Sequence, residues 1–126
     1  MRPKSLAEVA KLTTAGGSFD LCLANFLDEF YYAPNAMALN PAPAFLAPLS
    51  GELGRVRDAY LAATAEELAR KYGLALPLWV EEPERKLRQP WFASSLAGLR
   101  AVLIWESPPG FRSRNLFVSE NALSRA

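Results

Sequence analysis

The chain has 126 residues, the size of one ordinary domain. It carries 14 Lys and Arg against 13 Asp and Glu, a formal net charge of +1, and 51% of its residues are hydrophobic. This balance argues against a strongly basic nucleic-acid binder, and the apolar content excludes a disordered tail. The sequence contains no histidine, which excludes Ser/His/Asp and Cys/His catalytic triads and removes the commonest zinc ligand.

The single cysteine, Cys22, excludes an intramolecular disulfide and a cysteine-held metal cluster. Cys22 stands at helical spacing from Phe19 and Phe26, so we expect a small buried residue rather than a nucleophile. The first residues, MRPKSLAEVAK, lack the apolar core of a signal peptide, and no apolar run is long enough to span a membrane. We therefore expect a cytoplasmic protein that binds no metal and no cofactor.

Two helices are predicted in the first third of the chain. Ser5 and Glu8 have the spacing of a capping box, at the start of a helix that ends before Gly16-Gly17. Ser18 is a good N-cap for a second helix, which ends near Pro34. This helix carries one apolar stripe that should face a core: Phe19, Cys22, Leu23, Phe26 and Phe30.

Prolines dominate residues 34–50 and exclude a regular helix there. The segment also contains large apolar residues, so we expect a strap that lies on the core, with no domain boundary. A long third helix follows from about Gly51 to Tyr72. Further prolines break residues 74–92 into short pieces. There we expect three aromatic residues in the core (Trp79, Trp91, Phe92) and three basic residues on a solvated mixed-charge surface (Arg85, Lys86, Arg88).

A fourth helix is predicted from about Ser94 or Ser95 to Glu106, and nearly all of its positions are apolar. A helix that is apolar on all sides is normally central, so we expect Leu99 and Leu103 to be almost fully buried. A short strand over 116–118 and a last helical turn over 119–123 complete the expected elements. The predicted fold is mainly α: one irregular helical domain, residues 1–126, with about four helices, proline-rich connections and a short extended C-terminal segment.

The candidate functional residues follow the proline break after the fourth helix: Glu106, Arg112, Arg114 and Asn115. In extended chain, Arg112 and Arg114 would point the same way and could dock the carboxylates of a protein partner. The alternative is structural, because either arginine could pair with Glu106 or cap the end of the fourth helix. We expect at least one of the two arginines to be partly exposed.

Two stretches resemble a family of small bacterial proteins: SFDLCLANFLDEFY, and PWFASSLAGLRAVLIWESPPGFRSRNLFVSENALSRA. The second stretch also resembles the tail of helix-turn-helix regulator-like proteins that are encoded beside nucleotidyltransferase-like proteins as presumed toxin–antitoxin pairs. The resemblance covers residues 18–126 and implies an antitoxin-like, partner-binding role. The start of the chain is too short for a full helix-turn-helix domain, since only one predicted helix precedes the shared region.

Three functional hypotheses remain, in order of preference. The first is a non-enzymatic protein that binds a protein partner, and the resemblance implies that this partner is a nucleotidyltransferase-like toxin. The second is a DNA-binding transcriptional regulator, although the second helix carries acidic residues and no basic ones, and nucleic-acid binding by the isolated chain is not expected. The third is an enzyme, which would have to do acid–base chemistry without histidine.

Overall fold

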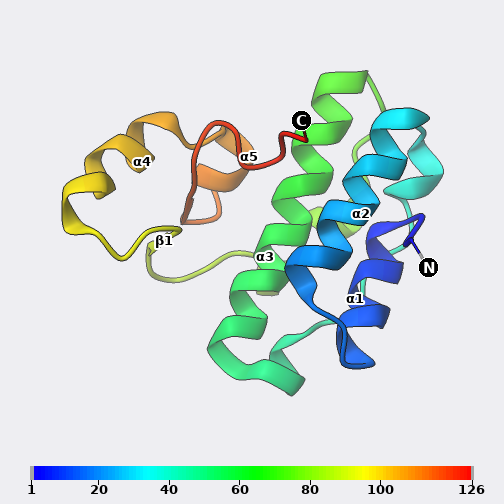
Figure 1. Cartoon of the computed structure of the whole chain (residues 1–126), viewed down its shortest axis with the longest axis horizontal. Coiled ribbons are helices and arrows are strands. Elements are labelled where there is room, and N and C mark those ends of the chain that lie inside the picture. Colours follow the sequence, from blue (N-terminus) through cyan, green and yellow to red (C-terminus); the bar gives the residue numbers. More distant parts are fainter. Residues whose placement is uncertain (1, 126) are drawn as a thin grey trace.

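Helices make up most of the computed structural model, which describes residues 2–125 (Figure 1). The described chain contains five α-helices, several short 3-10 turns and two strands of two residues each. The predicted mainly α fold is therefore confirmed. None of the helices in residues 2–125 is long and apolar enough to cross a membrane.

The first two helices match the sequence signals closely. Helix α1 spans Leu6–Thr14, and the Ser5 hydroxyl accepts a hydrogen bond from the Glu8 amide. Helix α2 spans Phe19–Tyr32, and the Ser18 hydroxyl accepts one from the Leu21 amide. The predicted stripe of α2 is buried apart from Cys22, which is half-buried. These two helices pack against each other and form one side of the core.

Helix α3, Ala47–Tyr72, is the central element, and it separates two apolar clusters. It begins four residues earlier than predicted and is kinked at Gly51, whose φ is 59°. It ends at Gly73, which adopts the left-handed conformation expected there. One side of α3 packs on α1 and α2 through residues such as Leu61 and Leu68, and the other packs on the C-terminal part through small residues such as Ala59.

The proline-rich strap lies on the core as expected, and a buried arginine holds it there. One short 3-10 turn, Ala36–Ala38, lies within the strap, and two more, Leu78–Glu81 and Pro83–Arg85, come after α3. Arg85 is fully buried and donates to the carbonyl oxygens of Pro43 and Asp58, and its guanidinium lies 4.4 Å from the ring centre of Phe45. The prediction of a solvated Arg85 is wrong, because Pro43 in the strap and Asp58 in α3 supply carbonyl acceptors that sequence spacing does not show.

Asp58 fixes the other end of the strap. Its two carboxylate oxygens accept hydrogen bonds from the amides of Leu46 (2.7 Å) and Ala47 (3.1 Å), at the start of α3. Burial raises the pKa of Asp58, and these two hydrogen bonds oppose that shift. The carboxylate therefore acts as a cap for a helix whose own first residues lack a side-chain cap.

The C-terminal part is built on a two-strand parallel pair. Strand β1 (Trp91–Phe92) pairs with β2 (Leu116–Phe117), with Trp91 opposite Leu116. Between the strands come the 3-10 turn Ala97–Leu99, helix α4 (Arg100–Glu106) and helix α5 (Pro109–Arg112). Residues 120–123 form a turn where a short helix over 119–123 was predicted.

Helix α4 is the main departure from the sequence prediction. Figure 1 shows α4, in yellow and orange, on the opposite side of α3 from α1 and α2. Leu103 is 8% exposed, as predicted, but Leu99 is 43% exposed and Trp105 is 87% exposed. The expectation of a central fourth helix is wrong, because α3 is longer and its small residues allow close packing on both of its sides.

Candidate protein-binding surface

Residues 93–107, which we call the arm, leave the body of the protein after β1 and return to it before α5. Both ends of the arm are fixed by hydrogen bonds to carbonyl oxygens of β2. The Ala93 amide donates to the Phe117 carbonyl (3.0 Å), and the buried Ser107 hydroxyl donates to the Leu116 carbonyl (2.8 Å). The rings of Phe92 and Phe117 also stack at the base, 5.1 Å apart. The arm is therefore held at a defined position.

The outer face of α4 is apolar and exposed. Leu103 turns toward the body, and helical geometry places Ala101 and Trp105 on the opposite side, flanked by Val102 and Ile104. All four residues are exposed, Val102 at 45% and Ile104 at 47%. Exposed apolar residues occur singly on any protein, but a contiguous face of them with a near-fully exposed tryptophan is typical of a protein-binding surface.

The charged residues of α4 lie on the side of the body instead. The Arg100 guanidinium lies 5.0 Å from the ring centre of Phe92. The Glu106 carboxylate accepts from the Ser119 hydroxyl (3.4 Å) and the Glu120 amide (3.3 Å). Glu106 is therefore engaged with the C-terminal segment and pairs with neither candidate arginine.

Arg112 lies at the base of the arm and is exposed, so the expectation of at least one exposed arginine is confirmed. Two of its guanidinium nitrogens donate to the Ser107 carbonyl, at 3.2 and 2.9 Å. This bond caps the C-terminal end of α4, which agrees with the structural alternative. The exposed remainder of the guanidinium still faces solvent beside the arm.

Arg114 has a different environment, since only 5% of it is exposed. It donates to the Glu66 carboxylate (2.9 Å) and to the carbonyls of Gly110 (2.7 Å) and Val80 (3.0 Å). The prediction that Arg112 and Arg114 point the same way is wrong, because Arg112 ends helix α5 and the chain between them is not extended.

Asn115 is positioned by its backbone. Its φ is 63°, the left-handed conformation that asparagine tolerates better than most residues. Its side-chain amide donates to the Leu87 carbonyl (2.7 Å), which joins the turn after α5 to the segment before β1. The four candidate residues therefore do not form one cluster, since each of them contacts a different part of the chain.

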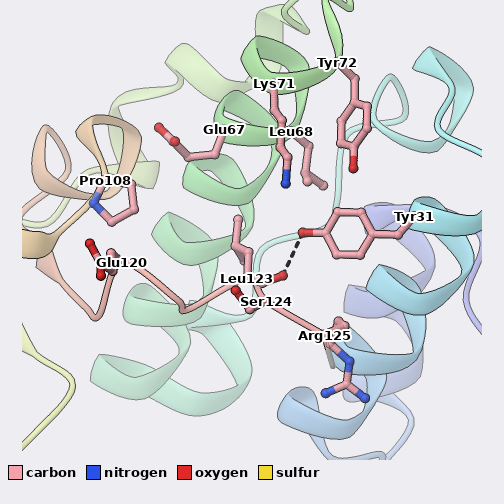
Figure 2. A pocket seen from close by; sticks show the side chains of 10 residues that line it. All are labelled: Tyr31, Glu67, Leu68, Lys71, Tyr72, Pro108, Glu120, Leu123, Ser124 and Arg125. Carbon is pink, nitrogen blue, oxygen red and sulfur yellow. Dashed lines mark hydrogen bonds between the residues drawn. The ribbon is translucent and has the colours of Figure 1, made fainter.

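A cavity of about 440 Å³ lies on another face, between α2, α3 and the C-terminal segment (Figure 2). The Tyr31 hydroxyl donates to the Leu123 carbonyl (2.7 Å), and burial raises the pKa of Tyr31 to about 12. The Lys71 ammonium lies 5.5 Å from the Tyr31 ring centre. Glu67 accepts from the Gly110 amide (2.8 Å) and from Arg70. Tyr31 therefore holds the C-terminal segment against α2, and Glu67 holds the start of α5 against α3.

Metal-ligating residues do not gather anywhere within residues 2–125: no three Asp, Glu or Cys side chains lie close enough to hold an ion. The cation–carboxylate contacts of this region are ion pairs, such as Arg125 with Asp28 at 2.9 Å.

Comparisons with known proteins found no match, so the outer face of α4 is interpreted from its own residues. No protein-family model matches the chain, no curated protein matches it, and no solved structure matches it.

The exposed face of α4 is the feature that sequence reasoning missed. The available signal was its length, since only about two helical turns separate SSLAG from SPPG.

Proposed function

We propose that this chain is a non-enzymatic protein-binding protein, the antitoxin-like member of a bacterial pair whose other member is nucleotidyltransferase-like. The observation that carries the protein-binding part is the outer face of α4, where Trp105 is 87% exposed among other apolar side chains. The nature of the partner comes from the resemblance of the C-terminal block.

The geometry suits docking because the arm is already in place before a partner arrives. Both of its ends are hydrogen-bonded to the β1–β2 pair, so little backbone entropy is lost on binding. A buried tryptophan is among the side chains that contribute most to protein interfaces. Arg112, exposed at the base, adds a guanidinium that can pair with a carboxylate at the rim of the same contact.

The test is co-expression of the tagged chain with the product of the neighbouring gene, followed by affinity purification and titration calorimetry. Trp105→Ser should weaken binding by at least tenfold, about 1.4 kcal/mol, because it removes the centre of the apolar face. Arg112→Ala should weaken it less and should reduce its dependence on salt.

Tyr32→Ser is the matched control, because Tyr32 is 90% exposed at the end of α2 and lies outside the arm. It should leave binding unchanged. If Trp105→Ser binds as tightly as the unmodified chain, α4 is not the docking surface. If the unmodified chain captures no partner at all, the pairing itself is wrong.

A further inference from the structure

The outer face of α4 has a size pattern that fits a second copy of the same helix. Each residue of an α-helix turns by about 100° and rises about 1.5 Å, so Ala101 and Trp105 share the side opposite Leu103. They stand two residues before and two residues after position 103. One is the smallest side chain of the face and the other is the largest.

An antiparallel pair of α4 helices, with a two-fold axis level with position 103, uses this pattern fully. Trp105 of each copy then lies over Ala101 of the other, where the short alanine side chain leaves room for the indole. On the two edges, Val102 meets Val102 of the second copy and Ile104 meets Ile104. A two-fold interface must be complementary to itself, and this face pairs its largest side chain with its smallest.

Electrostatics permit the same arrangement. Arg100 and Glu106, the charged residues of α4, lie on the side of Leu103, where one contacts the Phe92 ring and the other the C-terminal segment. Pairing of the outer faces therefore places no like charges opposite each other and desolvates no unpaired charge, which is the usual obstacle to burying a helix face.

We propose that α4 is a dimerisation helix, and that its occupant is α4 of a second copy of this chain. The inference rests on the proposed function only in taking the outer face of α4 as a protein-binding surface. Trp105 contributes on the order of 200 Å² of contact. The arm is a small part of the chain, and we expect its contact to fall below the roughly 800 Å² per partner of a standard interface. Interfaces below that size are typical of weak, transient association, so we expect a dimer that dissociates readily.

This affinity has a consequence for partner binding. A second copy and a heterologous partner would bind the same face of α4, so they exclude each other. The weak self-pairing keeps the apolar face covered when the chain is concentrated and free of partner, and a tighter partner displaces it by mass action.

The experiment is sedimentation equilibrium of the purified full chain across the micromolar range, with circular dichroism to verify folding. The unmodified chain should show a monomer–dimer equilibrium. Ala101→Trp should weaken the dimer by at least tenfold, because two indoles then compete for the same space. The double variant Ala101→Trp with Trp105→Ala should regain the dimer, because exchanging the large and small residues restores the complementarity.

Each result decides the matter. An unmodified chain that stays monomeric throughout this range overturns the dimer, and if it still binds the neighbouring gene product the proposed function stands. A double variant that stays as weak as Ala101→Trp overturns the antiparallel register. Tyr32→Ala, the control outside the arm, should leave the equilibrium unchanged. If it weakens the dimer as much as Ala101→Trp does, the interface is elsewhere and the proposal fails.

Discussion

Replacing Arg114 by methionine tests whether this arginine holds the structure together or serves a partner. Methionine keeps the aliphatic length of the side chain and removes the guanidinium. Three hydrogen bonds are lost, to Glu66 and to the carbonyls of Gly110 and Val80, in an environment where Arg114 is only 5% exposed. The two carbonyls and the carboxylate lose these bonds in a nearly dry site.

The expected cost is about 3 kcal/mol of unfolding free energy. Breaking a buried ion pair typically costs about 3–5 kcal/mol. The lower end applies because Glu66 keeps a second partner, Arg70, at 2.7 Å, and is itself partly exposed. For a domain of this size, a loss of about 3 kcal/mol lowers the Tm by roughly 10 °C.

Urea unfolding and thermal melting measure this directly. Arg112→Met is the matched control, because Arg112 is exposed and, within the described residues 2–125, its side chain donates to the Ser107 carbonyl alone. It should cost less than about 1 kcal/mol. If Arg114→Met melts within experimental error of the unmodified chain and yet loses partner binding, the assignment of Arg114 as a structural residue is refuted.

Three further outcomes are expected. Leu103→Ala should cost about 2–5 kcal/mol in urea unfolding, because Leu103 anchors α4 to the body; an unchanged midpoint would contradict that anchoring role. The folded-state pKa of Tyr31, about 12, lies above its usual value of 10, so its contribution to stability is complete below pH 10 and is lost as the pH rises toward 12. Tyr31→Phe should reduce that loss in unfolding measured at pH 9 and 11, and equal losses would exclude Tyr31 as its source. In gel shifts with its own promoter DNA, the isolated chain should bind no tighter than the roughly 10⁻⁴–10⁻⁶ M typical of non-specific contacts; tight, sequence-selective binding would instead favour a regulator.

Local signals predicted the N-terminal half well because its elements are fixed by nearby residues. The hydroxyls of Ser5 and Ser18 satisfy amides three residues ahead, and the stripe of α2 follows from helical spacing alone. The position of the strap was harder to predict from the sequence. Its position depends on Arg85 and Asp58, whose partners lie as far as 42 positions away along the chain. A cluster of alternating charges gives no indication that one member is fully buried.

Arg112 and Arg114 show why the candidate site could be predicted only in part. They stand two residues apart, and sequence spacing alone predicts the same environment for both side chains. A helical turn at Pro109–Arg112 sends one guanidinium to solvent and the other toward Glu66 on α3. The difference comes from a contact 48 residues away, which no local pattern contains.

The exposure of helix α4 could not be predicted from its sequence either. The hydrophobicity of a helix face indicates how much free energy is gained when that face is removed from water. It does not indicate which part of the protein, or which other chain, covers the face. The body of this protein already has its central helix in α3, which leaves the seven residues of α4 with room to bury one side only. We therefore interpret α4, an apolar segment that is short and fixed at both ends, as a surface that binds a second chain. We propose that the second chain can be another copy of this one, because Ala101 and Trp105 stand two residues before and two residues after position 103.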